Sequence, residues 1–362
     1  MSAAQYFIDS WFYRLMVLST PIPFRWHVRL SLMTGKMIHP SRFHSPWWAR
    51  NPHVQTIMAK YLHRTRINYR RERLELPDGD FVDLAWALPE TDKRRPLVLL
   101  FHGLEGCVES HYAKGMMAAL HRQGWQPVLM HFRGCSGEPN RYLQAYHSGA
   151  IEDPHYVLAL LRDRYPERPM AAIGYSLGGN MLVNYLAEHP RNPLSAAVVI
   201  SAPLQLAACA DRINRGFSRC YQRYLLGRMK FNWQQRLRRH PHHQWQGKLD
   251  RIRSLREFDD KITAPVHGFR DAEDYYRRCS GLYKLPNIST PTLVIHAADD
   301  PFMNDAVIPD ASELPPAVTY ELSRTGGHVG FMQGPPWRPR YWLEQRVPQW
   351  LAEQWPPYQE KT

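Results

Sequence analysis

The chain has 362 residues, of which 44% are hydrophobic, and a formal net charge of +13. Its length exceeds that of an average domain but does not demand a second independent core. The five cysteines are scattered, odd in number and form no Cys-x-x-Cys pair, which favours a reducing compartment over secretion and argues against a disulfide framework.

Residues 1–68 precede the first predicted strand and are rich in Trp, Phe, Arg and Pro. No stretch reaches the roughly 20 apolar residues of a membrane span, and none has the pattern of a secretory signal. The cations that interrupt the apolar stretches are Arg14, Arg25, Arg29 and Lys36. Residues 6–16 have helical spacing, so we expect a helix that packs on the protein or lies at a membrane interface; the few lysines favour packing. We therefore expect a cytoplasmic protein, with contact to the inner face of the membrane left open.

The next residues predict a hairpin and then a regular alternation of strands and helices. Arg73–Leu76 and Phe81–Ala87 are β-rich runs separated by the turn Pro77–Asp80. The strands expected after this hairpin are 97–101, 126–132, 169–173, 196–200, 291–296 and 317–322, with helices at 111–123, 152–165 and directly after residue 176. This alternation predicts an α/β fold with a mostly parallel sheet and helices on both faces.

Gly174-Tyr175-Ser176-Leu177-Gly178 stands between a predicted strand and a predicted helix. In this context the pattern Gly-x-Ser-x-Gly indicates a nucleophile elbow, a tight turn that projects a serine hydroxyl. Such a turn leaves room for only hydrogen two residues before and two residues after the serine, and glycines fill both places. Ser176 is therefore the candidate nucleophile.

A serine hydroxyl needs a histidine to accept its proton and a carboxylate to orient that histidine. In a fold of this class the chain order is Ser, Asp, His. The strand 291–296 leads into Asp299, Asp300 and a proline, and the position directly before the proline favours Asp300 over Asp299. His328 follows the last predicted strand in a glycine-rich loop, from which an imidazole can reach Ser176. These residues predict serine hydrolase chemistry.

The attack of such a serine on a carbonyl creates an oxyanion that backbone N–H groups can stabilise. We expect one N–H from Leu177, directly after the nucleophile. We expect the second from Leu104, in the turn that follows strand 97–101, where Gly103 lets the chain reverse.

Several further motifs of this chain are similar to those of one known protein family. They are Phe101–Gly106, His131–Glu138, Gly174–Asn180 and Ala298–Phe302, and the segment Asn51–Thr56 fits them. Together they resemble the α/β-hydrolases, and more closely the YheT-like branch that includes eukaryotic abhydrolase-domain lipases and esterases. The resemblance covers about residues 45–350. It implies hydrolysis of carboxylic esters with short or medium acyl chains, or of monoacylglycerols.

Residues 204–287 interrupt the rhythm of strands, at the place where hydrolases of this type insert a cap. Residues 204–258 hold thirteen Lys and Arg against three Asp and Glu. A solvated basic face is the default explanation, and attraction to an anionic membrane or an acidic acyl substrate is the next. No nucleic-acid-binding motif is present, so we expect no nucleic-acid partner. The histidines 240, 242 and 243 lack a carboxylate or thiolate beside them, so we assign no metal, and we expect no cofactor.

The sequence thus predicts an amino-terminal extension (1–68), an α/β-hydrolase core (69–203 and 288–362) and a basic cap (204–287). The predicted activity is cleavage of small-molecule or lipid esters through an acyl-enzyme. Acyl transfer and thioester cleavage use the same triad and remain alternatives. A catalytically idle binding protein is the alternative of another class. No motif encodes the acyl length, the head group or the oligomeric state.

Overall fold

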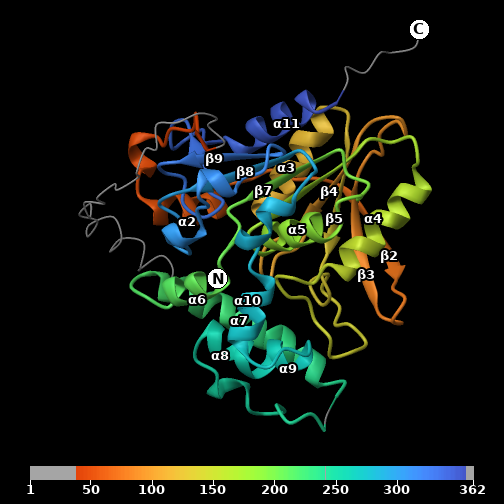
Figure 1. Cartoon of the computed structure of the whole chain (residues 1–362), viewed down its shortest axis with the longest axis vertical. Coiled ribbons are helices and arrows are strands. Elements are labelled where there is room, and N and C mark those ends of the chain that lie inside the picture. The colour runs from red at the N-terminus through yellow and green to blue at the C-terminus, as the bar shows by residue number, and fades with distance from the viewer. Residues whose placement is uncertain (1–37, 241, 356–362) are drawn as a thin grey trace. The chain divides into compact units, whose positions relative to one another are not determined.

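The computed structural model describes residues 38–240 and 242–355, which form a nine-stranded sheet with helices on both faces (Figure 1). The strand order is β1-β9-β8-β7-β6-β4-β5-β3-β2. β3 (Phe81–Ala87) runs antiparallel to β2 (Tyr69–Glu75) and to β5 (Gln126–His131), and the other neighbouring strands are parallel. The predicted α/β fold with a mostly parallel sheet is confirmed.

Apart from β1 and α11, which the sequence did not predict, the strands of the sheet and its covering helices follow the predicted order. The other strands are β1 (Ile38–Pro40), β4 (Leu97–Phe101), β6 (Met170–Tyr175), β7 (Ala196–Ile200), β8 (Thr292–Ala297) and β9 (Val318–Ser323). The covering helices are α3 (His111–Arg122), α4 (Glu152–Arg164), α5 (Leu177–Glu188) and α11 (Leu343–Glu353). The short elements are η1 (Trp47–Ala49), η5 (Asp305–Val307), η6 (Ala311–Glu313), β10 (Met332–Gln333) and β11 (Arg340–Tyr341).

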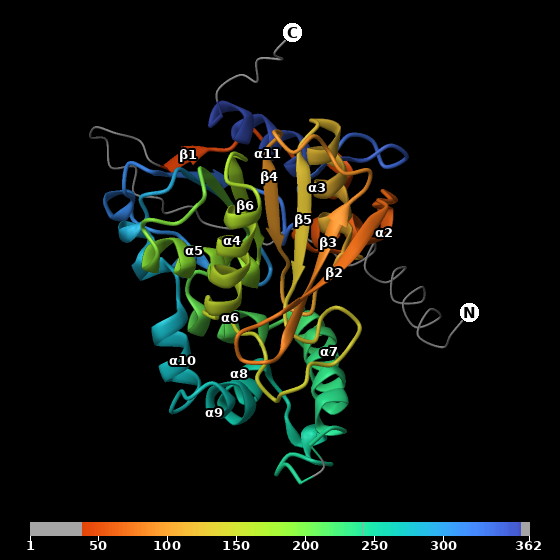
Figure 2. The same cartoon turned by 90° about the vertical axis from the view of Figure 1, so that its right-hand side faces the viewer.

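The core has two layers, one on each face of the sheet. Side chains of a strand alternate between the faces, so Leu97 and Leu99 of β4 pack with α4 and α5, whereas Val98 and Leu100 pack with α3 and α11. Figures 1 and 2 show these helices on opposite sides of the strands. Because the central strands are buried on both faces, they consist mostly of apolar residues, which is why sequence located them well.

The sheet begins earlier in the chain than the sequence predicted. β1 (Ile38–Pro40) pairs in parallel with β9 at the edge of the sheet, so the prediction that residues 1–68 all precede the first strand is wrong. The three residues of β1 are half-buried or exposed and show no alternation of apolar and polar side chains. They pair with β9 through backbone groups. α2 (Pro52–Leu62) follows, capped by Asn51, whose side chain accepts from two backbone N–H groups. The helix predicted within residues 6–16 lies outside the described residues.

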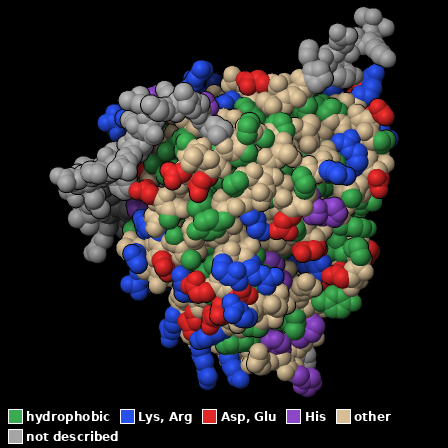
Figure 3. Space-filling view, in the orientation of Figure 1, with side chains coloured by type: hydrophobic (Ala, Val, Ile, Leu, Met, Phe, Trp, Pro, Cys, Tyr) green, Lys and Arg blue, Asp and Glu red, His purple; other side chains and the backbone are tan. Residues whose placement is uncertain are grey.

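A group of helices lies between β7 and β8. It comprises α6 (Leu206–Ile213), α7 (Ser218–Leu237), η2 (Leu249–Arg251), α8 (Leu255–Phe258), η3 (Asp259–Thr263), α9 (Ala264–Val266), α10 (Ala272–Cys279) and η4 (Leu282–Asn287). Figures 1 and 2 show α6 to α10 gathered beyond one end of the strands. Figure 3 shows Lys and Arg side chains, in blue, on the surface of this lower end of the molecule. Buried side chains of α7, η2, α8 and η3 form a hydrophobic cluster of their own. Within residues 38–240 and 242–355, no helix combines the length and the apolarity that crossing a bilayer requires.

Candidate active site

Ser176 lies in a tight turn between β6 and α5. Its φ is +50°, in the left-handed region that side-chain-bearing residues rarely adopt, and its N–H donates to the Ile200 carbonyl at 2.8 Å. A Cβ added to Gly174 would lie 2.5 Å from the Gly178 carbonyl oxygen, and one added to Gly178 would lie 2.5 Å from the His102 carbonyl oxygen. Only glycine fits at either position, so the turn has the close packing that an elbow requires.

The three residues predicted as a triad lie in one hydrogen-bonded row. His328 Nε2 lies 3.0 Å from Ser176 Oγ, and His328 Nδ1 lies 2.8 Å from Asp300 Oδ2. They follow β6, β8 and β9, whose carboxyl ends meet at one edge of the sheet. When Nδ1–H donates to the buried carboxylate, Nε2 is free to accept the serine proton. The arrangement can therefore generate a nucleophilic serine.

The structure distinguishes between Asp299 and Asp300 as the partner of His328, a choice for which the sequence provided only weak evidence. Asp300 contacts the imidazole, whereas Asp299 Oδ1 accepts the Gly327 N–H at 2.9 Å and holds the loop that carries His328. The other oxygen of Asp299 is buried and has no hydrogen-bond partner among the described residues. Burial raises the pKa of Asp299 to about 7, the Gly327 N–H opposes this rise, and the Asp300 charge adds to it.

The two predicted oxyanion donors are available. In the described residues neither the Leu104 N–H nor the Leu177 N–H donates to another residue, and Leu177, the first residue of α5, has no partner within its helix. The loop before Leu104 passes beside the nucleophile, since a Cβ on Gly103 would lie 3.2 Å from Ser176 Cβ. The Gly103 N–H donates to the Tyr112 hydroxyl at 2.9 Å, which holds this loop in place.

The loop after β4 that carries the Leu104 N–H is called the oxyanion loop below, after its predicted role. Glu105 connects this loop to α7. Its φ is +56°, and its N–H donates to the Tyr146 hydroxyl at 2.8 Å. Its carboxylate accepts from the same hydroxyl and from the Asn232 side-chain amide, and its carbonyl accepts from Arg228 Nη2 at 3.3 Å. Burial raises the pKa of Glu105. The inserted helix therefore helps to position the loop that carries the Leu104 N–H.

α2 supports the histidine loop from another side. The His328 N–H donates to Thr56 Oγ1 at 2.9 Å. Gln55 is fully buried and bonds both backbone groups of Met332, at 2.7 and 3.1 Å. From sequence we assigned Asn51–Thr56 no role in the site. The Asn-Pro pair is a helix-start signal that could have located α2, but no local pattern shows which loop the helix contacts.

Aromatic rings cover one side of the imidazole. The Phe302 ring stacks on His328 with a centroid separation of 4.0 Å and an interplanar angle of 6°. The ring centroid of Tyr221 on α7 lies 4.9 Å from that of Phe302, and the Tyr221 hydroxyl is 3.0 Å from His53 Nδ1. These rings exclude water from that side of the proposed base.

A cavity of about 640 Å³ opens between the loop after β4 and α7. Its lining includes Gly106–Glu109, Gly134–Gly137, Tyr224, Arg228 and Phe231. Ser176 is absent from that lining, so the cavity begins beside the oxyanion loop rather than over the hydroxyl. In the described part of the chain, no three His, Cys, Asp or Glu side chains are grouped as metal ligands.

The fold and the site geometry are those of an α/β-hydrolase. The family model for the alpha/beta hydrolase fold matches residues 96–335, and the chain belongs to this family. Among solved structures, the esterase Pf2001 of Pyrococcus furiosus has a TM-score of 0.52 and 18% identity, covering 88% of this chain and 98% of that chain. At this identity the likeness is one of fold.

Curated relatives place the chain more narrowly. "Putative esterase YheT" of Escherichia coli (strain K12) is 49% identical over 313 residues, which cover 83% of this chain and 90% of that protein. Phospholipase ABHD3 of Bos taurus is 29% identical, covering 79% of this chain and 72% of that protein. Monoacylglycerol lipase of Saccharomyces cerevisiae is 31% identical over 67% of this chain and 56% of that protein. The predicted membership of the YheT-like branch is confirmed.

Replacing Asp299 by Asn should change how stability depends on pH. Folded wild type holds the Asp299 proton up to about pH 7, whereas the unfolded chain loses it near pH 4. Between these values the unfolded state binds fewer protons, so this group lowers stability as pH rises from about 4 to about 7. Asn does not titrate and still accepts the Gly327 N–H. Over this window the variant should therefore gain stability relative to wild type in urea unfolding.

The control for this measurement is Asp163→Asn, which alters an exposed carboxylate on α4. Its unfolding free energy should follow the wild-type pH curve. The same parallel course for Asp299→Asn would contradict the raised pKa.

Proposed function

We propose that this protein is a serine hydrolase that cleaves carboxylic esters through an acyl-enzyme intermediate. The observation that carries the proposal is the row Ser176–His328–Asp300 beside the N–H groups of Leu104 and Leu177, neither of which has an acceptor among the residues that the structure describes. Membership of the α/β-hydrolase family supports it. The names of relatives, which include an esterase, a phospholipase and a monoacylglycerol lipase, support an ester substrate.

In the first half-reaction, His328 Nε2 takes the proton of Ser176 as Oγ attacks the ester carbonyl carbon. The Leu104 and Leu177 amides hold the resulting oxyanion, and Asp300 stabilises the imidazolium. The intermediate then collapses, the carbon–oxygen bond to the alcohol breaks, and His328 returns its proton to the departing oxygen. The alcohol leaves and the acyl group remains on Ser176.

Water completes the cycle. His328 accepts a proton from water as its oxygen attacks the acyl carbon, and a second oxyanion forms at the same two amides. Its collapse releases the acid and returns the proton to Ser176. We propose esters of short or medium acyl chains, or monoacylglycerol-like lipids, as substrates; the cavity of about 640 Å³ beside the oxyanion loop has the volume for part of such a molecule.

We further propose that the protein works in the cytoplasm and touches anionic lipid surfaces through α7. This helix contains no Asp or Glu, and its exposed residues include Arg219, Arg223, Arg228, Tyr224 and Phe231. The side chains of Tyr224 and Phe231 are more than half exposed. Basic residues beside exposed aromatic rings complement anionic headgroups and the apolar layer below them. Three of these residues also line the large cavity, so lipid would meet its entrance.

Ser176→Ala should abolish labelling by a fluorophosphonate and lower kcat by several orders of magnitude on p-nitrophenyl esters, because the variant has no nucleophile. Its thermal unfolding should match wild type. A series of acyl lengths would then describe the pocket of the active protein. Wild type that folds but neither labels nor turns over would contradict the proposal and favour a binding role.

Thr56→Val should lower kcat by about tenfold and leave KM nearly unchanged, because valine has the same shape but cannot accept the His328 N–H. Thr56→Ser keeps the acceptor and is the matched control, with kcat close to wild type. The position of the histidine loop would not depend on this bond if both variants kept full kcat.

Arg219→Glu combined with Arg223→Glu should weaken binding to phosphatidylglycerol vesicles by at least about tenfold, because each cation near an anionic surface contributes on the order of 1 kcal/mol. Binding to phosphatidylcholine vesicles should be weak for all proteins. Arg122→Glu with Arg324→Glu makes the same change of net charge at exposed positions outside α7. Equal loss in both double variants would show that net charge, rather than α7, governs binding.

A further inference from the structure

The turn after β8 contains a residue that contacts both the proposed orienting acid and the proposed base. Phe302 stands two residues after Asp300. Its ring lies on the imidazole of His328, with a centroid separation of 4.0 Å and an interplanar angle of 6°. Its backbone N–H donates to Asp300 Oδ1 at 2.8 Å. A residue outside the triad therefore contacts two members of the triad, through two different groups.

The backbone contact completes the hydrogen bonding of the Asp300 carboxylate. The side chain of Asp300 is 1% exposed, so protein groups must replace water at its oxygens. Oδ2 lies 2.8 Å from His328 Nδ1, and Oδ1 accepts the Phe302 N–H. Donors on both oxygens fix the orientation of the carboxylate and stabilise its charge. This contact belongs to the backbone, so it does not depend on which side chain stands at position 302.

The ring of Phe302 covers one face of the imidazole and leaves its edges free. The N–H and the lone pair of an imidazole lie in the plane of its ring, and the Phe302 ring is nearly parallel to that plane. The phenyl ring therefore restricts tilting of the imidazole without entering the space between His328 Nε2 and Ser176 Oγ, which are 3.0 Å apart. The centroid separation of 4.0 Å is shorter than the range of about 4.5–7 Å common for aromatic pairs, so the two faces are in close contact.

The face of a phenyl ring also carries partial negative charge, and it attracts a cation that lies over it. In the proposed reaction His328 is neutral before it accepts the serine proton and cationic afterwards. The side chain of His328 is 10% exposed, so little water weakens this attraction. The ring of Phe302 therefore stabilises the imidazolium more than the neutral imidazole. Because the imidazolium forms in the transition states of both half-reactions, this preference favours catalysis.

The other titratable groups around His328 are mostly neutral. Burial lowers the pKa of three neighbouring imidazoles, to about 4 for His53 of α2 and His296 of β8, and to about 3 for His111 of α3. The Arg212 charge on α6 further lowers the pKa of His53. Burial raises the pKa of the Tyr221 hydroxyl on α7, which stays neutral. Burial raises the pKa of Asp299 to about 7, but Asp299 Oδ1 bonds the Gly327 N–H. Among these groups and Phe302, the charge and the ring face that contact the imidazole are those of Asp300 and Phe302.

The first turn of α7 holds the turn that carries Phe302. Ser218 is fully buried, and its Oγ donates to the Pro301 carbonyl at 2.6 Å. The ring centroid of Tyr221 lies 4.9 Å from that of Phe302. Ser218 and Tyr221 are three residues apart and therefore lie on one face of the helix. This face of α7 thus contacts both the backbone before Phe302 and its ring.

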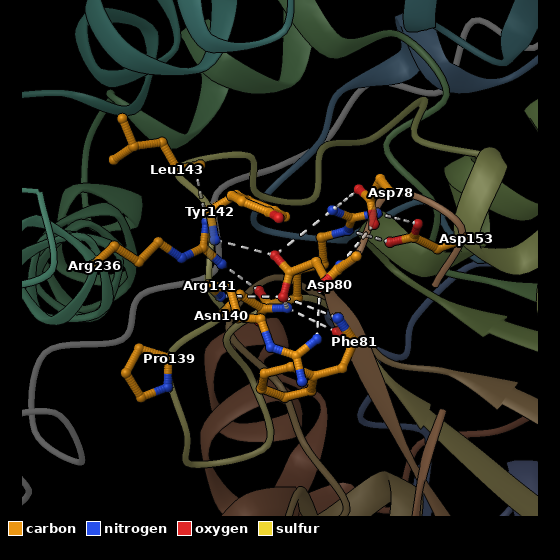
Figure 4. A network of polar contacts seen from close by, with 12 residues as sticks. Asp78, Asp80, Phe81, Pro139, Asn140, Arg141, Tyr142, Leu143, Asp153 and Arg236 are labelled. Carbon is orange, nitrogen blue, oxygen red and sulfur yellow. Dashed lines mark hydrogen bonds and ion pairs between the residues drawn. The ribbon is translucent and has the colours of Figure 1, made fainter. Parts of the chain in front are cut away.

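The other end of α7 is also fixed to the core. Arg236 Nη2 donates to the Arg133 carbonyl at 2.5 Å, and Figure 4 shows Arg236 extending toward the loop that contains Leu143. The guanidinium of Arg133 in turn donates to Asp78 and Asp153, at 2.6 and 2.7 Å. Because α7 has buried contacts near both ends, its first turn is a firm support for the turn after β8.

We propose that Phe302 is a positioning residue of the reaction, whose ring orients His328 and stabilises the imidazolium that forms when Ser176 loses its proton. The inference rests on the proposed function and adds to the triad a residue that acts through the base. Removal of the ring should slow the chemical steps and leave substrate binding nearly unchanged. It should also shift the protonation of His328 to lower pH, because the cationic form loses a partner and the neutral form does not.

Phe302→Leu removes the ring and keeps the backbone N–H that bonds Asp300. On p-nitrophenyl esters, kcat should fall by at least about threefold while KM stays within about twofold of wild type, since the ring acts on the base. The acid limb of the kcat/KM profile reports protonation of the base in the free enzyme. This limb should move to lower pH by about half a unit. A fall of kcat with an unmoved acid limb would contradict the proposal.

Two variants serve as controls. Phe302→Tyr keeps an aromatic face over the imidazole, so its kcat and its acid limb should stay close to those of wild type. Phe217→Leu makes the same exchange elsewhere in the aromatic group, where the Phe217 ring contacts those of His53 and Tyr221. It should leave the acid limb in place. A shift in either control as large as that in Phe302→Leu would indicate altered packing and overturn the proposal.

Thermal unfolding verifies that each variant is folded. Should Phe302→Leu be unstable, Phe302→Met is the second variant without a ring, and the same fall of kcat and shift of the acid limb are expected for it.

An NMR titration of the imidazole forms the second arm and needs no turnover. The ring signal of His328 is assigned by its loss in His328→Gln. The titration midpoint of this signal should lie about half a pH unit lower in Phe302→Leu than in wild type. An unchanged midpoint would overturn the proposal even in an active enzyme. If wild type neither hydrolyses esters nor takes a fluorophosphonate label, the proposed function fails, and the midpoints still decide whether the ring stabilises the imidazolium.

Discussion

The arrangement of the site depends on one steric constraint, the close approach of the serine turn to the strands on either side of it. β6 lies between β4 and β7, and the turn after β6 passes so near the carbonyl groups after β4 that position 178 has no space for a side chain. This contact brings Ser176 beside the loop of Gly103 and Leu104. Two strands and a turn therefore bring the proposed nucleophile and the proposed oxyanion donors together before any residue of the inserted helices contributes.

Around this centre, segments from distant parts of the chain hold different components in place. α2 contacts the histidine loop through Thr56, and α7 contacts the oxyanion loop through Glu105. A ring from the loop after β8, Phe302, lies on the imidazole. The proposed base and the loop of the proposed donor Leu104 are thus each supported by an element outside the central sheet. The serine needs no such support, because its position follows from the packing of the strands.

Sequence was informative where chemistry or burial leaves a local pattern. The central strands were located because both of their faces are apolar, and Ser176, Asp300 and His328 were chosen from motif spacing and chain order. β1 was missed because three edge residues carry no periodicity. The contacts of Thr56 and Glu105 were also missed, since each joins residues more than 90 positions apart. A hydrogen bond of this kind depends on tertiary packing and leaves no signature in neighbouring residues.

The contact between α2 and the histidine loop has a consequence for how this family diverges. The family match spans residues 96–335, whereas Thr56 and Gln55 lie outside it. The shared core therefore does not contain all that holds its own histidine. A relative that keeps the core but replaces the segment before it must hold the histidine loop by other contacts. Changes in the two regions should accordingly be inherited as a pair, and the segment that must be kept together is longer than the residues that the family model matches.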